Sequence, residues 1–283
     1  MRNTTPSEGA CLAHDLKTWN QNLSDRRRAL SWLGLGALTP LGLLGCLGDD
    51  ATAAGVGTSP STVTRGACSA IPSATRGPFP GDGSNNNANG VANALLLSGI
   101  VRRDIRSSII TSTTTAGGVQ LTVTLTLVNT KKSCASLAGH AIYLWHCDRT
   151  GMYSMYSSGV TNENYLRGVQ VTDGKGQVTF TTIFPGCYAG RMPHLHFEVY
   201  SSLEAATTTS SSGPVKTSQI AFPTAVCNAV YATSGYNASI GNFARMSFES
   251  DIVFRDGHST QLASVTGDAA NGYIANQAVG IPD

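Results

Sequence analysis

Charged side chains are scarce in this chain of 283 residues: Asp, Glu, Lys and Arg make up only 13% of it, against roughly 25% in an average soluble protein. The formal net charge is +2, and no long run of like charge occurs. These features exclude the basic footprint of a nucleic-acid-binding protein and the charged tail of an interaction protein. Ser, Thr, Asn and Gly must supply the polar surface instead.

Helical periodicity is scarce as well, and after the N-terminal segment the sequence indicates only a short helix over 225–231. Alternating apolar and polar residues over 119–127 predict a strand, and the run 141–147 is apolar on both faces, which is typical of a central strand. Many short strands separated by turn residues predict an all-β fold, a β-sandwich with long loops and little helix, over roughly 210 residues.

The other stretches of this domain are expected to alternate between strands and loops. A turn at 173–176 lies between two strand-like runs, 168–172 and 177–184, and this arrangement predicts a β-hairpin. Further runs favour strands, whereas segments rich in Ser, Thr, Asn or Gly favour surface loops. The additional strands are expected at 194–199, 219–222, 252–254 and 262–265, and the loops at 81–90 and 201–212.

No pair of cysteines has the CxxC spacing of a thiolate zinc site, so a structural zinc site of that kind is not expected. Five cysteines lie beyond the N-terminal segment, and they allow at most two internal disulfides with one thiol left over. This usage suits an oxidising destination outside the cytoplasm. The sequence leaves the pairing open among Cys68, Cys134, Cys147, Cys187 and Cys227.

Residues 1–46 are expected to form an export signal rather than part of the fold. Three consecutive arginines, Arg26 to Arg28, precede an apolar but Gly-rich run over 29–47, a pattern typical of the twin-arginine route. The run is nearly long enough to span a bilayer, so a retained membrane anchor is the alternative. The predicted destination is the periplasm, the cell surface or the medium.

The end of this signal, Leu43-Leu44-Gly45-Cys46, resembles a lipoprotein processing box in which Cys46 would carry the lipid. A membrane contact is expected only through that lipid, and cleavage near Ala53 is the competing outcome. Residues 47–63 are rich in Gly, Ala, Thr and Ser and are expected to form a flexible tether. The folded domain would then occupy 64–283.

Two histidines share one face of a predicted strand, because His194 and His196 alternate with Leu195 and Phe197. Two imidazoles on a stiff strand make a two-point clamp for a metal ion. The glycines that flank Tyr188 could let the preceding turn bring its phenol to the same place. The stretch therefore predicts a metal site, and an amphipathic strand with two ordinary surface histidines is the alternative.

The chain also contains a series of separate motifs between residue 65 and about residue 280. The segments are Arg76-Gly77-Pro78-Phe79, Arg102-Arg103-Asp104-Ile105, Leu144-Trp145-His146-Cys147-Asp148, Gly151-Met152-Tyr153-Ser154, Leu166-Arg167-Gly168-Val169-Gln170-Val171-Thr172-Asp173, Thr182-Ile183-Phe184-Pro185-Gly186 continuing to His196, and Thr217-Ser218-Gln219-Ile220-Ala221-Phe222-Pro223. In order and rough spacing they resemble the intradiol ring-cleavage dioxygenases, and especially the extracellular, single-domain relatives of protocatechuate 3,4-dioxygenase. A set of motifs in the family order is far more specific than any one of them.

The resemblance implies one Fe(III) per chain, held by Tyr153, Tyr188, His194 and His196. The chemistry is consistent with this set, because Fe(III) is a hard cation that favours anionic oxygen. A phenol with an ordinary pKa of about 10 loses its proton when it binds such a metal. Zinc or copper would gain much less from two tyrosines.

The family also implies the reaction, in which O2 cleaves a catechol-type ring between its two hydroxylated carbons to give a muconate-type diacid. Tyr188 would leave the metal and accept a catechol proton, and Arg191 would stabilise negative charge on the ring. Gln219 would line the same pocket, although the loop before it lengthens its distance from the histidines. Gly77 and Pro78 would belong to the arm that walls the substrate cavity.

Two other classes of protein have to be weighed. A non-catalytic β-sandwich that binds a catechol or a carbohydrate would share the fold, but the complete set of four ligands together with Arg191 argues against it. A cupin-type oxygenase also uses a His-x-His pair, but its acidic ligand follows at a longer spacing than Glu198 does here. No added helical domain of the kind that forms family dimers is visible, so the oligomeric state stays open.

Overall fold

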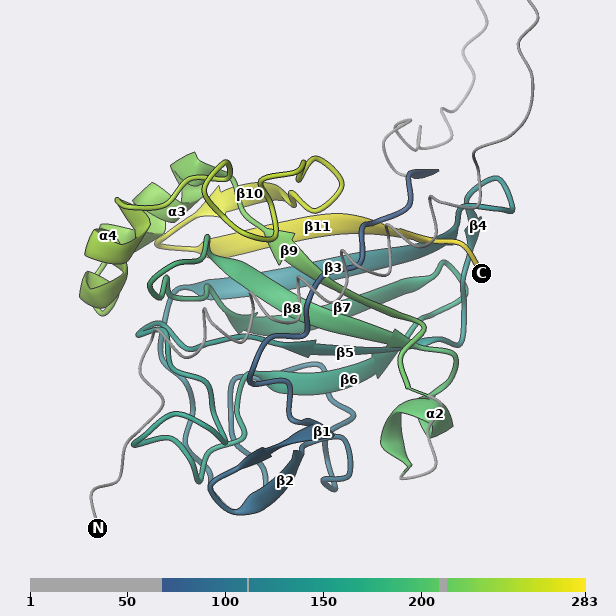
Figure 1. Ribbon diagram of the computed structural model, residues 1–283, viewed down its shortest axis with the longest axis horizontal. Helices are drawn as coiled ribbons and strands as arrows, with labels where there is room; N and C mark the ends of the chain where they lie inside the picture. The colour runs from purple at the N-terminus through teal and green to yellow at the C-terminus, as the bar shows by residue number, and fades with distance from the viewer. Residues whose placement is uncertain (1–67, 111, 209–212) are drawn as a thin grey trace, which may run out of the picture.

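The computed structural model describes residues 68–110, 112–208 and 213–283. Their strands form a five-stranded sheet, a four-stranded sheet and a separate two-stranded hairpin. Figure 1 shows the two larger sheets as the layers of a sandwich, with short helices at both ends. The all-β prediction is therefore confirmed, whereas the predicted signal over 1–46 and the tether over 47–63 lie outside the described residues.

The five-stranded sheet is built around β3 (Gln120–Asn129). This strand pairs in parallel with β11 (Gly272–Ile281) and antiparallel with β7 (Gln177–Ile183). The outer positions belong to β10 (Ser264–Asp268), next to β11, and to the short β4 (Ala135–Ser136), next to the end of β3. The alternation of apolar and Thr residues thus predicted the central strand of this sheet correctly.

The four-stranded sheet has the order β6-β5-β8-β9, with all neighbours antiparallel. Its strands are β6 (Arg167–Val171), β5 (Ala141–Trp145), β8 (His194–Tyr200) and β9 (Lys216–Ala221). All five residues of β5 are buried, as expected of a central strand that is apolar on both faces.

The core lies between the two sheets, and each sheet contributes every second residue of its central strands. Leu121, Val123 and Leu125 of β3 are at most 1% exposed, and they belong to the same apolar cluster as Leu195 and Phe197 of β8. Because side chains alternate along a strand, the residues between these on β8 must point to the outer face of the four-stranded sheet. This outer face carries the functional residues.

An extended arm over 71–80 and the hairpin of β1 (Asp82–Asn87) and β2 (Gly90–Asn93) cover the outer face. The arm starts beside β11, where the amide of Ile71 donates to the carbonyl of Gly280 (2.9 Å). It then runs along β9 before it crosses the sheet. The Asn- and Gly-rich stretch 81–90, which was expected to be a loop, therefore forms most of a hairpin.

A disulfide between Cys68 and Cys134 ties the start of this arm to the residue just before β4, with the two Cα atoms 5.4 Å apart. The sequence had left the pairing open. Cys147, Cys187 and Cys227 are free thiols, and all three are buried. The described cysteines thus form one bridge, where at most two were predicted.

Three short helices complete the fold. The helix expected over 225–231 is α3 (Thr224–Tyr231), and α4 (Asn237–Phe243) follows it at one end of the sandwich without having been predicted. The stretch 201–212 was expected to be a loop throughout, but α2 (Leu203–Thr207) forms within it because the Ser202 side chain caps its first turn. In the described part of the chain, no helix has both the length and the apolar character needed to cross a bilayer.

The prediction of a hairpin around 173–176 is wrong. The two flanking strands belong to different sheets: β6 pairs with β5, and β7 pairs with β3. The turn itself forms, since the Asp173 side chain accepts hydrogen bonds from the amides of Lys175 and Gln177 (both 2.8 Å). The chain uses this turn to pass from one layer of the sandwich to the other.

The strand expected over 252–254 is also absent, because these residues form turns. The Asp251 carboxylate accepts hydrogen bonds from the amides of Val253 (2.8 Å) and Phe254 (3.2 Å), and this bends the backbone away from an extended form. The strand expected over 262–265 is displaced towards the C-terminus and begins at Ser264 as β10.

Candidate active site

Strand β8 positions the two histidines side by side on the outer face of the four-stranded sheet. His194 and His196 are 1% and 2% exposed. The register places His196 opposite Trp145 of β5 and opposite Gln219 of β9. The indole of Trp145 stacks on the His196 imidazole, with the ring centres 5.0 Å apart and 5° between the planes. This stacking fixes the orientation of the imidazole.

Nε2 of His194 contacts both the other imidazole and the phenol of Tyr188. Nε2 of His194 lies 3.1 Å from Nε2 of His196 and 3.2 Å from the Tyr188 hydroxyl. Nδ1 of His194 is 2.7 Å from the carbonyl oxygen of Met192. With the proton held at Nδ1 by that carbonyl, Nε2 of His194 presents a lone pair to the cluster.

Tyr188 reaches this position because its loop packs closely against the turn that precedes Tyr153. The amide of Gly186 donates to the carbonyl of Asp148 (3.0 Å), and a Cβ atom at position 186 would lie only 2.7 Å from the carbonyl oxygen of Arg149. Only glycine fits there without moving the backbone. The two tyrosine segments, far apart in the sequence, are thereby joined.

Tyr153 completes the group from the opposite side. Its ring centre lies 5.9 Å from that of Tyr188 and 6.2 Å from that of His196. The phenol is 3% exposed, and its hydroxyl makes no hydrogen bond of normal geometry to any described residue. Burial raises the pKa of Tyr153 well above its ordinary value, and the nearby Tyr188 raises it further. A buried hydroxyl without a partner is unfavourable unless something else binds it.

The protonation states of the imidazoles suit metal binding. Burial lowers the pKa of His194 and of His196 well below the ordinary value, and the charge of Arg191 lowers both further. Both rings are therefore neutral at physiological pH and can use a lone pair as a ligand.

The chemistry of the donors selects the kind of metal. Within the described ranges, no group of three or more His, Cys, Asp and Glu side chains is arranged to hold a metal ion. The further oxygen donors beside the two imidazoles are the phenols of Tyr153 and Tyr188. Two phenol oxygens and two imidazole nitrogens fit Fe(III), because a hard trivalent cation stabilises phenolates.

Arg191 lies beside this group and is held rigidly. It is 1% exposed, its Nε donates to Asp251 (3.0 Å), and its Nη2 donates to the side-chain oxygen of Gln219. The same carboxylate accepts a hydrogen bond from the Met192 amide (2.6 Å). Asp251 could not be predicted from the sequence, since a single aspartate in a turn has no motif.

The predicted pocket residues on the arm lie on the same face. The carbonyl of Thr75 accepts a hydrogen bond from the Gln219 side chain (2.8 Å), so the arm reaches Gln219, which in turn touches Arg191. Gly77 has a φ angle of +70°, and its amide donates to the Thr75 hydroxyl (3.0 Å). Pro78 follows, with its carbonyl held by Asn85 (2.6 Å). The longer loop before β9 has thus not moved Gln219 away from His196.

Known proteins resemble this arrangement. The family model described as Dioxygenase matches residues 105–210. The structure of an intradiol ring-cleavage dioxygenase from Tetranychus urticae is 26% identical, with a TM-score of 0.53, covering 65% of this chain and 88% of that one. A second dioxygenase structure is 27% identical, with a TM-score of 0.51 and the same coverage of both chains.

Over residues 105–210 the sequence matches a dioxygenase family model, and the fold resembles that of intradiol ring-cleavage dioxygenases. A search of curated proteins gave no match. Together the four predicted metal ligands, Arg191 and Gln219 occupy one continuous region of this intradiol dioxygenase fold, and the arm with Gly77 borders it.

A further ionic cluster lies under the arm. Glu198 points to the same face as His196, is fully buried, and accepts a hydrogen bond from Tyr200 (2.8 Å). Arg76 approaches Glu198 (3.7 Å) and also pairs with Asp82 of β1 (3.0 Å). Burial raises the pKa of Glu198 to about 7, and the charge of Asp82 adds to this, whereas Arg76 opposes it.

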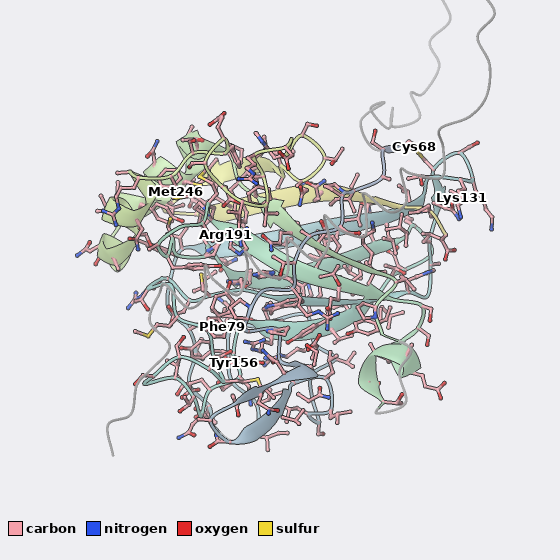
Figure 2. The ribbon with its side chains drawn as sticks, viewed as in Figure 1. Cys68, Phe79, Lys131, Tyr156, Arg191 and Met246 are labelled. Atoms are coloured by element: carbon pink, nitrogen blue, oxygen red, sulfur yellow. A yellow bond between two sulfur atoms is a disulfide. The ribbon has the colours of Figure 1, made fainter. Side chains whose placement is uncertain are left out.

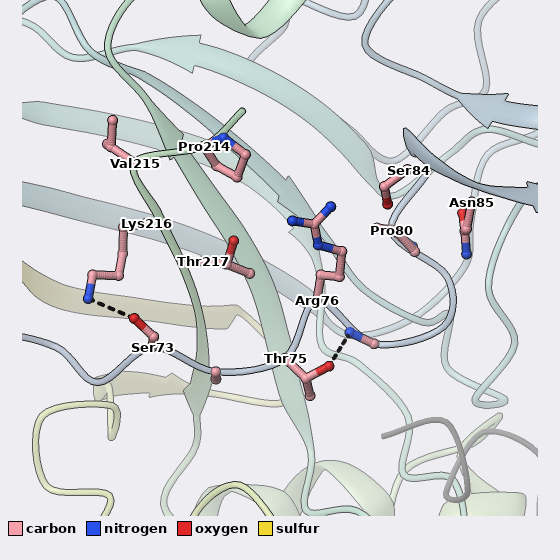
Figure 3. Close-up of a pocket in the computed structure, with 12 residues that line it drawn as sticks. Ser73, Thr75, Arg76, Pro80, Ser84, Asn85, Pro214, Val215, Lys216 and Thr217 are labelled. Carbon is pink, nitrogen blue, oxygen red and sulfur yellow. Dashed lines mark hydrogen bonds between the residues drawn. The ribbon is translucent and has the colours of Figure 1, made fainter. Parts of the chain in front are cut away.

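Arg76 also stands in the middle of a pocket of about 470 Å³ next to the arm. Figure 3 shows its guanidinium between Pro214 and Thr217 on one side and Ser84 on the other. Gly77 lines this pocket, whereas Pro78 does not. The arm therefore separates two regions: the residues around His196 and the pocket around Arg76.

Proposed function

We propose that this protein is an Fe(III)-dependent intradiol dioxygenase with one iron per chain. Its substrates would be a catechol-type aromatic compound and O2, and its product a muconate-type diacid. One observation carries the proposal: Nε2 of His194 lies 3.2 Å from the Tyr188 hydroxyl and 3.1 Å from Nε2 of His196. The nearby Tyr153 hydroxyl has no hydrogen-bond partner among the described residues.

Tyr153, Tyr188, His194 and His196 would hold the iron. When bound, Fe(III) would stabilise the deprotonated catechol and draw electron density from it, so that the ring can react with O2. The protein supplies the rigid setting. Trp145 stacks on His196, and the Met192 carbonyl fixes the tautomer of His194.

Tyr188 is the ligand best placed to exchange with substrate. Its side chain is half-buried, whereas Tyr153 is buried, and its hydroxyl already contacts His194. When a catechol binds, the Tyr188 phenolate would move aside and accept a catechol proton at its Oη. The deeper Tyr153 would keep its place throughout.

Arg191 would stabilise negative charge on the catechol ring. Asp251 and Gln219 hold its guanidinium beside the histidines, so that it does not have to reorganise during the reaction. Gly77 and Pro78 of the arm would limit the cavity in which the ring lies.

The test is a measurement of oxygen consumption and product with catechol as the probe. The purified protein should consume one O2 per catechol and release a diacid that absorbs in the ultraviolet. A yellow product would indicate cleavage outside the two hydroxylated carbons, and binding of catechol without oxygen consumption would reduce the protein to a binding module. Either result would refute the proposed reaction.

We further propose that the protein is exported by the twin-arginine route, with Cys46 as a lipid-anchored residue. Changing Arg26 and Arg27 to Lys should trap the precursor in the cytoplasm, and changing Cys46 to Ala should release the domain from the membrane. Fractionation of cells that express each variant measures both effects. Normal export of the double-Lys variant would contradict the twin-arginine route.

A further inference from the structure

Arg167 is a fully buried cation for which the reaction outlined above has no use. It opens β6 and is 0% exposed. Among the described residues, no carboxylate lies within salt-bridge distance of its guanidinium. Burying an unpaired charge is costly even when it is hydrogen-bonded, so a role beyond packing needs to be sought.

Every N–H group of this guanidinium is used. Nε donates to the hydroxyl of Ser154 (3.0 Å), and Nη2 donates to the carbonyl of the same residue (2.9 Å). Nη1 donates to the carbonyl of Pro80 (2.7 Å) and to the hydroxyl of Tyr143 (3.1 Å). A further hydrogen bond runs from Nη2 to the carbonyl of Phe79 (3.0 Å). Only the planar fork of Arg, with five donors, can make this set.

Apart from the Tyr143 hydroxyl on β5, these acceptors belong to two segments that face the proposed iron site. Ser154 directly follows the ligand Tyr153, and Phe79 and Pro80 directly follow the cavity-wall residues of the arm. The two segments also touch each other, because the Phe79 ring lies 5.2 Å from that of Tyr153 and 5.1 Å from that of Tyr156. Figure 2 shows Phe79 and Tyr156 close together beneath the four-stranded sheet.

We propose that Arg167 is a positioning residue that locks the arm to the Tyr153 loop. The cavity wall and the ligand tyrosine then keep a fixed position relative to each other. This inference rests on the proposed function. Without Arg167, three arm and loop carbonyls and the Ser154 hydroxyl would each lose a donor. Both segments could then shift independently, although none of the four ligands would have been changed.

Arg167→Lys tests this, because it keeps the charge and removes the fork. Hydrogen exchange of the peptide around 75–81 should accelerate about tenfold, in the protein as purified and after iron has been removed by chelation. In the iron-loaded enzyme the visible tyrosinate band should shift, and KM for catechol should rise about tenfold while kcat changes about threefold or less.

Arg102→Lys is the matched control. Arg102 is half-buried and donates to the carbonyls of Ser107, Asn164 and Arg167 itself, but it contacts neither the arm nor the Tyr153 loop. It should lower thermal stability and leave the visible band, KM and arm exchange unchanged. If Arg167→Lys behaves in the same way, Arg167 is merely structural and the inference is wrong.

Ser154→Ala provides a milder second variant in case Arg167→Lys does not fold. It removes the Ser154 hydroxyl, one acceptor of the guanidinium, and keeps the backbone. The visible tyrosinate band should therefore shift in the same direction as in Arg167→Lys, but by less. An unchanged band and unchanged arm exchange in this variant would overturn the proposal. A wild-type protein without any visible band would instead refute the proposed iron site, and the exchange of the arm would still test the lock.

Discussion

The role of a single residue in this structure depends on the residues that surround it. A lone buried tyrosine near a glycine turn would usually be a packing residue, and Tyr153 differs only because its unpartnered hydroxyl faces Tyr188 and His196. The motifs could predict that these residues meet. They could not predict the contacts that hold these residues in place. Asp251 lies in a turn without a motif, and Met192 contributes only its backbone carbonyl.

Arg191→Ala should retain iron and lower kcat by roughly a hundredfold, which is the usual effect of removing a preorganised charge stabiliser. The reason is that Arg191 contacts Asp251 and Gln219 rather than serving as a ligand. Steady-state kinetics and iron analysis measure the two quantities. Arg245→Ala, at an exposed arginine on the same side of the fold, is the control. Complete loss of iron from the Arg191 variant would show a structural role instead.

Glu198 should make the stability of the metal-free protein depend on pH. Its pKa is about 7 in the folded state, above the ordinary 4.5, so the folded state binds the proton more tightly. The stabilisation is complete below about pH 4.5 and is lost as the pH rises through 7. As the pH rises from 5 to 8, the free energy of unfolding of Glu198→Gln should therefore increase by up to about 3 kcal/mol relative to that of wild type.

Urea unfolding at these two pH values measures the difference. Glu204→Gln changes an exposed carboxyl of α2 and should show no such gain. Equal behaviour of the two variants would mean that Glu198 is not buried as an acid in the folded protein.

At the level of elements, the sequence predicts the strands whose periodicity is strong and fails where pairing is decided by distant residues. The alternation over 119–127 and the apolar run over 141–147 each gave a real central strand. The turn at 173–176 was also real, but a turn does not determine whether its flanking strands pair with each other. Here β7 pairs with β3, and β6 pairs with β5.

Gly176→Ala should destabilise the protein by more than about 1 kcal/mol, because position 176 has a φ angle of +74° and an added Cβ would lie 2.4 Å from the carbonyl oxygen of Leu127. Gly174→Ala lies in the same turn, with open space around its Cβ position, and is the matched control. Denaturant unfolding of both variants tests whether this turn is pressed against β3. Equal stabilities would contradict that packing.

For the whole molecule, the sequence predicts the sandwich and not the arm that closes it. The motif around Gly77 indicated a cavity wall, but its course depends on contacts from every layer. These include the disulfide at Cys68, the Gly280 carbonyl and the guanidinium of Arg167. Such contacts join residues more than sixty positions apart, and no local pattern reports them. Functional residues of the four-stranded sheet, of the neighbouring loops and of the arm therefore meet only in the folded chain.

The visible absorption spectrum of the purified protein tests the central claim most directly. Ligand tyrosines on Fe(III) give a broad visible band, so the account predicts a reddish protein with about one iron per chain. The band should shift to longer wavelength when catechol is added without oxygen. Tyr153→Phe and His196→Ala should each abolish it, whereas Tyr165→Phe, which changes a tyrosine bonded to Asp148 instead, should keep it. A colourless protein that contains iron would contradict the two-tyrosine site.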